Sequence, residues 1–321
     1  MSETTFTSHG SRCGATLVLA ALVSPTSTDL DGPAGRPCVV MAHGFGCTRD
    51  GGLMPFAERF AAAGAEVLLF DYRGFGTSEG EPRQAVSHRR QRQDYHAAVA
   101  HARTLPGVDP DRIVLWGTSY SGGHVVAVAA KDHRVAALIA QGAAVDGLAI
   151  LRKDEKSDPA APPDKGRRMV AAALRDAVGA LVRRPPVLVA SVGAPGDFAM
   201  LTDPHSYADY LALMGPTWDP KVCARSLLGV PFNRPVRSAD QITCPALLVL
   251  AERDTIAPPE AVRETARRIG PQAEVVAFDC PHFDIYRGEV FERSVSAQVA
   301  FLQRTVGTLP PGTLPPETLG S

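Results

Sequence analysis

The sequence predicts an α/β protein with a mostly parallel, doubly wound sheet and a helical insertion in its second half. The first reason is that short apolar runs alternate with amphipathic stretches, which is the order of strands and helices in such sheets. The second is that these runs are apolar throughout, as in strands covered on both faces. The expected strands span 37–42, 65–70, 112–116, 135–140, 245–251 and 273–278, and the expected helices span 53–63, 90–104, 119–130, 259–269 and 288–304.

The alternation stops at about residue 142 and resumes near residue 245, which predicts an insertion into a single core. We expect residues 1–141 and 239–305 to form the core, residues 142–238 a cap, and residues 306–321 a Pro-rich tail. Within the cap, the pattern predicts a helix whose apolar stripe over 169–181 packs on the core. It also predicts short helices over 207–214 and 222–228.

The composition limits the classes of binding partner that we expect. The 321 residues carry 33 Lys and Arg against 34 Asp and Glu, with 45% hydrophobic and 21% charged residues. This near-neutral balance argues against nucleic acid or an anionic membrane as the main partner. No apolar run reaches the roughly 18 residues of a membrane span. A small-molecule substrate is the expected ligand, and the sequence does not reveal the oligomeric state.

The cysteines indicate a reducing compartment, which we take to be the cytoplasm. They are scattered without a CxxC pair, so they form neither a disulfide framework nor a zinc site. They lie at positions 13, 38, 47, 223, 244 and 280. The apolar segment 14–23 could pass for the core of a signal peptide, but Glu3 precedes it and no clear cleavage site follows. A core strand is the favoured interpretation.

The residues Gly117-Thr-Ser-Tyr-Ser-Gly-Gly123 follow a predicted strand and open a predicted helix. A nucleophile at such a turn occupies a strained conformation and needs small neighbours two positions before and after it. Gly117 and Ser121 meet this need around Ser119, the candidate nucleophile. Ser121 is the rival, although it would lie inside the helix. A phosphate-binding loop is disfavoured because no GK[ST] or GxGxxG pattern is present.

A second glycine-rich loop, His43-Gly-Phe-Gly46, follows the strand predicted at 37–42. A serine that attacks a carbonyl needs backbone N–H groups to stabilise the oxyanion. We expect these from Tyr120, next to the nucleophile, and from Phe45. His43 is expected to shape the loop rather than act as the base.

Together with Phe70-Asp-Tyr-Arg-Gly-Phe-Gly-Thr-Ser78, these motifs resemble the α/β-hydrolase superfamily. The form with an inserted cap resembles its serine-hydrolase branch of esterases and peptidase-like enzymes. The resemblance covers about residues 1–305, weakly in the cap, and implies the α/β-hydrolase fold. It also implies that Asp71 and Arg73 hold a turn and are not catalytic.

The family's order of nucleophile, acid and histidine selects two further residues. Asp254 lies on the loop after strand 245–251, and His282 lies after strand 273–278. An imidazole must take the serine proton, and a carboxylate must fix its tautomer. Asp146 is the alternative acid. The remaining histidines and Cys280 lack the spacing of metal ligands, so we expect neither metal nor cofactor.

A serine nucleophile leaves hydrolysis of esters, thioesters or lactones as the favoured activity. Alternatives are a peptidase or amidase, or C–C bond hydrolysis, with the same triad. A non-catalytic ligand-binding module is disfavoured because no triad member is missing. Large apolar residues of the cap are expected to line an apolar substrate cleft. They are Phe198, Met200, Tyr207, Tyr210, Met214 and Trp218.

Overall fold

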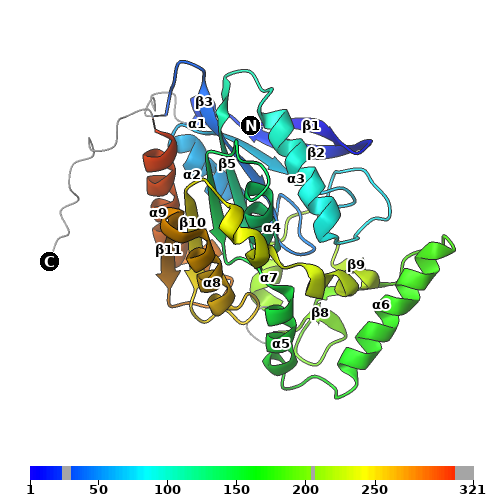
Figure 1. Ribbon diagram of the computed structural model, residues 1–321. Helices are drawn as coiled ribbons and strands as arrows, with labels where there is room; N and C mark the ends of the chain where they lie inside the picture. Colours follow the sequence, from blue (N-terminus) through cyan, green and yellow to red (C-terminus); the bar gives the residue numbers. More distant parts are fainter. Residues whose placement is uncertain (24–29, 204–206, 308–321) are drawn as a thin grey trace.

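A central sheet organises the molecule, and a computed structural model describes it over residues 1–23, 30–203 and 207–307. The strand order is β1-β2-β4-β3-β5-β6-β10-β11 (Figure 1). All strands from β4 to β11 in this order run parallel, while β1 and β2 form an antiparallel hairpin whose β2 pairs with β4. The strands are β1 (Ser2–Ser8), β2 (Ser11–Val18), β3 (Arg36–Ala42), β4 (Glu66–Phe70), β5 (Val108–Thr118), β6 (Ala137–Gln141), β10 (Ala246–Ala251) and β11 (Ala273–Phe278).

Helices cover both faces of the sheet, which confirms the doubly wound prediction. On one face, α2 (Met54–Ala62) and α9 (Gly288–Val306) pack around Phe56 and Trp116. On the other face, α3 (His88–Ala102), α4 (Tyr120–Ala129) and α8 (Pro259–Ile269) contribute to a second apolar cluster, which includes Tyr95 of α3. The apolar runs that predicted buried strands are indeed buried, because a layer of helices lies on each face of the sheet. Within the described residues, no helix is long and apolar enough to cross a membrane.

The chain order creates a crevice at one end of the sheet. β3 lies between β4 on one side and β5 on the other. The chain passes from β3 to β4 in one direction, and then crosses back over β3 to β5 in the opposite direction. In open parallel sheets, such a switch point separates the loops at the carboxyl ends of the strands and is the usual ligand site. The loops after β3 and β5 carry the two glycine-rich motifs described above.

The amino-terminal segment shows one predicted and one unpredicted feature. The strand interpretation of segment 14–23 is confirmed over Gly14–Val18, which belongs to β2. Residues Ala20–Val23 instead form a short helix, α1. The preceding strand β1 was not predicted, and the hairpin extends the sheet beyond β4.

The segment between β6 and β10, called here the inserted segment, is less helical than expected. It holds a three-stranded sheet in the order β8-β7-β9, which the sequence did not reveal. The helix predicted over 222–228 is wrong at its start, where the chain forms strand β9 before a 3₁₀ helix. The elements of the inserted segment are α5 (Gly147–Ser157), α6 (Lys165–Leu181), β7 (Leu188–Val192), β8 (Ala199–Leu201), α7 (Tyr207–Leu213), β9 (Lys221–Cys223), η1 (Ala224–Phe232) and η2 (Pro235–Gln241).

The α6 stripe is only partly buried, which corrects the expectation that it packs on the core. Met169 and Ala173 are buried, but Leu174, Val178 and Leu181 are 52%, 61% and 83% exposed. The helix extends away from the central sheet (Figure 1) and contacts η1 along one side. Because its apolar residues span a wide arc, one contact surface covers only part of them.

The short 3₁₀ helices η3 (Gly270–Gln272) and η4 (Asp284–Tyr286) complete the core. All six cysteines are buried and free. The Pro-rich tail predicted over residues 306–321 falls outside the described residues from position 308 onward.

Candidate active site

Ser119 occupies the sharp turn between a strand and a helix. β5 ends at Thr118 and α4 begins at Tyr120, and Ser119 has φ 54° and ψ −119° between them. A positive φ is unfavourable for a residue with a Cβ, so the surroundings must hold it. The Ser119 N–H donates to the Gln141 carbonyl at 2.8 Å, and its carbonyl accepts from the Ala144 N–H at 2.9 Å. The backbone therefore presents this side chain at the end of the sheet.

Two glycines permit this tight turn. A Cβ on Gly117 would lie 2.3 Å from the Ser121 carbonyl oxygen, and a Cβ on Gly123 would lie 2.2 Å from that of Ala144. Both contacts are with backbone, which side-chain motion cannot relieve. The small residues of the motif are therefore required by the close approach of the chain to itself.

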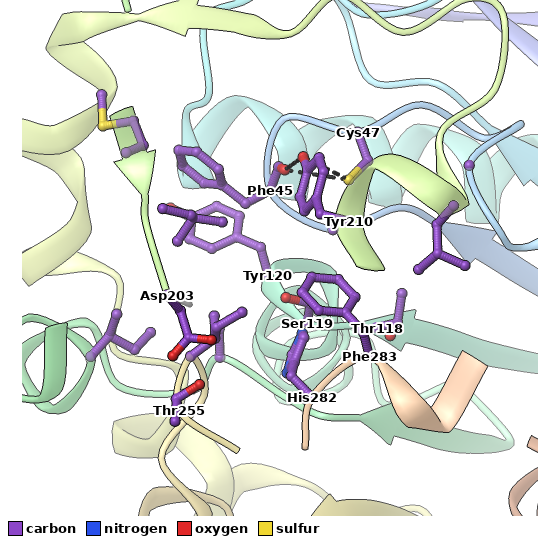
Figure 2. Close-up of a pocket in the computed structure, with 18 of the residues that line it drawn as sticks. Phe45, Cys47, Thr118, Ser119, Tyr120, Asp203, Tyr210, Thr255, His282 and Phe283 are labelled. Atoms are coloured by element: carbon purple, nitrogen blue, oxygen red, sulfur yellow. Dashed lines mark hydrogen bonds between the residues drawn. The ribbon is translucent and has the colours of Figure 1, made fainter. Parts of the chain in front are cut away.

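Ser121, the rival nucleophile, is held in the interior. It is fully buried, its hydroxyl donates to the Ala42 carbonyl at 2.6 Å, and it accepts from the Thr118 N–H at 2.9 Å. It joins the loop after β3 to the turn after β5. Ser119, in contrast, lines a cavity at this end of the sheet (Figure 2).

His282 and Asp254 form a buried pair beside Ser119. His282 Nδ1 lies 2.5 Å from Asp254 Oδ2, and the two residues are 3% and 1% exposed. The other oxygen of Asp254 accepts from the N–H groups of Ile256 and Ala257, at 2.8 and 2.7 Å. These bonds fix the carboxylate, which in turn orients the imidazole. His282 and Ser119 line the same cavity, and Figure 2 shows their side chains together on its wall.

Asp146, the alternative acid, is engaged elsewhere. Its carboxylate caps α5 by accepting from the N–H groups of Leu148 and Ala149. It also forms a bidentate pair with Arg234, at 2.9 and 2.7 Å. This carboxylate therefore holds two parts of the inserted segment together.

Phe45 and Tyr120, the expected oxyanion donors, lie on either side of Ser119. Both line the cavity, and their rings meet edge to face with centroids 5.6 Å apart. A Cβ on Gly44 would lie 3.1 Å from the Ser119 Cβ, so the loop after β3 passes close to Ser119. The Tyr120 N–H belongs to the first turn of α4, where such groups have no partner within the helix.

The other buried histidines near the site are structural. His43 is buried against Tyr72, and its Nδ1 lies 3.0 Å from the Gly44 carbonyl. His124 pairs with the Gln91 side chain at 3.0 Å. Burial lowers the pKa of both imidazoles, so both are neutral near pH 7.

Some of the cap residues that the sequence predicted for the cleft line this cavity, and others do not. Met200, Tyr210 and Met214 line it. Phe198, Tyr207 and Trp218 do not: Phe198 packs below the Arg168 guanidinium at 5.0 Å, Tyr207 is 36% exposed, and Trp218 donates to the Gly46 carbonyl at 3.0 Å. Sequence reasoning missed several lining residues, namely Cys47, Ile150, Asp203, Leu227, Ile256, Phe283 and Tyr286. Ile256 and Phe283 had a signal, because they adjoin Asp254 and His282 in sequence.

This fold and site define an α/β hydrolase. The sequence model of the α/β hydrolase fold family matches residues 37–289, and the chain belongs to that family. It is 41% identical over 272 residues to the quorum-quenching protein AidA of Acinetobacter baumannii, covering 84% of this chain and 87% of that protein. It is 29% identical to thiohydrolase aneE of Aspergillus aculeatus, covering 85% and 86% of the two chains.

Solved structures agree on the fold. The α/β hydrolase GrgF from Penicillium superposes with a TM-score of 0.75 at 23% identity, covering 95% of this chain and 98% of that one. The confirmed prediction is therefore the α/β-hydrolase fold, reached from three motifs at the ends of strands.

Proposed function

We propose that the protein is a serine hydrolase that cleaves a carboxylic ester, thioester or lactone with Ser119, His282 and Asp254. The observation that carries this proposal is the 2.5 Å contact between His282 Nδ1 and Asp254 Oδ2, next to a serine held at positive φ. A carboxylate, an imidazole and a strained serine at three strand ends are the components of acyl transfer through a covalent intermediate.

In this proposal, His282 Nε2 removes the Ser119 hydroxyl proton as Oγ attacks the substrate carbonyl. Asp254 accepts the Nδ1–H bond, which keeps Nε2 free to act as the base and stabilises the imidazolium that forms. The N–H groups of Phe45 and Tyr120 stabilise the oxyanion. Collapse of the tetrahedral species transfers the histidine proton to the leaving group. Water activated by His282 then releases the acid and restores Ser119.

The cavity wall supports an acyl group as the recognised part of the substrate. Met200, Tyr210, Met214, Leu227 and Ile256 give it an apolar surface, on which an uncharged chain is favoured over an unpaired charge. The inserted segment supplies the first four. We therefore propose that residues 142–238 act as a cap that selects a small-molecule substrate.

Transfer of an acyl group from a thioester is the second candidate. It is favoured by the names of two relatives, the thiohydrolase above and the polyketide transferase af380 of Aspergillus fumigatus, which is 28% identical over 274 residues. Both reactions share the acyl-enzyme and differ in the group that accepts the acyl. Asp203 lies on the cavity wall, and a carboxylate can bind a substrate amine. Aminoacyl amides are therefore included among the substrates tested.

The test is labelling with a fluorophosphonate, followed by a panel of acyl esters, acyl thioesters, lactones and aminoacyl amides. We expect labelling of the wild type and of Ser121→Ala, and none of Ser119→Ala. Labelling of Ser119→Ala would refute the assignment of the nucleophile. Faster turnover of amides than of esters would replace the esterase proposal by an amidase.

We also propose a cytoplasmic location, which the six free, buried cysteines support because thiols stay reduced in that compartment. Fractionation of the producing cells tests it, and recovery of the protein outside the cytoplasm would refute it.

A further inference from the structure

A second cavity lies within the inserted segment, beside the catalytic one. The loop around Ala161, the start of α6 and the end of η1 line it. It is partly open to solvent, because its lining residues Val170 and Phe232 are 46% and 75% exposed. Its wall is mainly apolar and includes Met169, Leu228 and Pro231. It has a volume of about 890 Å³, whereas the catalytic cavity has about 110 Å³.

The two cavities share one wall. Leu151, Met200, Thr202 and Leu227 line both. Met200 lies on β8 and Leu227 on η1, so two separate elements of the inserted segment contribute to this wall. Methionine is unbranched and changes rotamer easily, and a leucine can also turn aside without disturbing the backbone. The wall is thus a partition of movable side chains.

The volumes indicate why the partition matters. Sites for small molecules usually enclose roughly 300–1,000 Å³. The catalytic cavity falls below that range and the second cavity lies within it. A short acyl group can be held beside Ser119 alone. A longer chain needs further space, and the adjoining apolar space lies behind Met200 and Leu227.

The chemistry of the second cavity favours an uncharged chain. Its charged lining residues are Asp158, Lys165 and Arg167. The Lys165 ammonium lies 3.2 Å from Asp158 Oδ2 and also donates to the Thr202 hydroxyl, whereas Arg167 is exposed at the rim. The Asp158 carboxylate additionally accepts from the Gly196 N–H at 3.1 Å. The paired Lys165 is a poor anchor for an anion, and the exposed Arg167 side chain can stay in solvent, so the apolar wall favours an uncharged chain.

We propose that the second cavity binds the distal part of a long, unbranched acyl chain whose carbonyl is attacked by Ser119. The chain passes between Met200 and Leu227. This inference rests on the proposed function and assigns it a substrate class, namely long-chain acyl esters or thioesters.

The experiment compares kcat/KM for p-nitrophenyl butyrate and dodecanoate in the wild type and in Leu228→Trp. Leu228 lines the second cavity and not the first, so an indole there fills the space for the chain end. We expect the ratio of dodecanoate to butyrate kcat/KM to fall at least tenfold. Ala161→Trp, at another lining position of the second cavity, serves if Leu228→Trp does not fold. Val275→Trp, at a half-exposed position on β11, is the matched control and should keep the wild-type ratio.

Titration with dodecanoate and butyrate anions separates this inference from the proposed function. Unchanged ester ratios in both cavity variants would overturn the second cavity and leave the serine hydrolase standing. If the wild type hydrolyses no ester, thioester or lactone, the proposed function fails, and the titration alone decides. Tight binding of dodecanoate that Leu228→Trp loses would then support the cavity, and equal binding by both proteins would overturn it.

Discussion

The Tyr210 hydroxyl donates a hydrogen bond to the Phe45 carbonyl at 2.8 Å, which joins α7 of the inserted segment to the loop that carries an expected oxyanion donor. The Cys47 thiol adds a contact to the Tyr210 oxygen at 3.1 Å, and Trp218 Nε1 donates to the Gly46 carbonyl at 3.0 Å. Figure 2 shows the Tyr210 ring between Phe45 and Cys47, with dashed lines for both contacts. The inserted segment therefore holds the loop after β3 in place as well as covering the cavity.

Tyr210→Phe is expected to lower kcat on the order of tenfold while KM changes little. The phenyl ring keeps the apolar surface that the substrate contacts, but the loop loses a bond that fixes the Phe45 peptide. Complete loss of an oxyanion donor costs roughly 10²–10³ in kcat, so a loosened one costs less. Steady-state kinetics on one ester measure both constants.

The control is Tyr207→Phe, on the same helix but partly exposed and outside the cavity wall. It should behave as wild type. A rise in KM at constant kcat in Tyr210→Phe would show that Tyr210 only contacts the substrate.

Trp218→Ala is expected to leave the preferred acyl length unchanged and to lower kcat. The sequence placed Trp218 among the residues that line the cleft, and substitution there would then have changed chain-length preference. In the structure, its indole packs on Tyr210, with centroids 5.7 Å apart, and holds Gly46. A series of acyl lengths tests this, and a shifted optimum would return Trp218 to the substrate site.

Asp254→Asn is expected to lower kcat on the order of 10⁴, because an amide leaves His282 in the wrong tautomer. Asp146→Asn should cost far less, since it weakens only a pair with Arg234 and a helix cap. Both substitutions keep the size of the side chain, so they are matched. If Asp146→Asn were the more damaging, the acid would lie on the loop after β6.

The proposed catalytic residues could be selected from the sequence because their signals are local. Ser119 sits in a turn whose steric needs are met within four residues, and Asp254 and His282 each follow an apolar run. The partners of the cap aromatics were not accessible. Whether Tyr210 or Trp218 faces the cavity depends on how β9, α7 and the loop after β3 pack together. The spacing of residues along one helix does not predict that packing.

The α6 stripe shows the same limit. Apolar spacing over 169–181 predicts a helix, which the structure confirms, but it does not reveal which part of the stripe a neighbour covers. Met169, near the start of α6, is buried, and Leu181 lies exposed at the end of the helix.

The stability of the protein is expected to fall as the pH is lowered from about 6.5 towards 4. Burial, with lesser effects of Arg92 and Arg89, lowers the pKa of His88 to about 4, and burial also lowers the pKa of His43 and His124. An unfolded histidine has a pKa of about 6.5, so in this window the unfolded chain binds more protons than the folded one. Acidification therefore lowers the free energy of unfolding.

Urea unfolding at pH 5 and pH 7 measures this difference in the wild type and in His88→Gln. The variant cannot take up the proton at position 88, so its stability should change less between the two pH values. His133→Gln, at an exposed position, is the control and should keep the wild-type pH dependence. If the free energy of unfolding changed by the same amount between pH 7 and pH 5 in His88→Gln and in the wild type, His88 would already be protonated in the folded protein at pH 5.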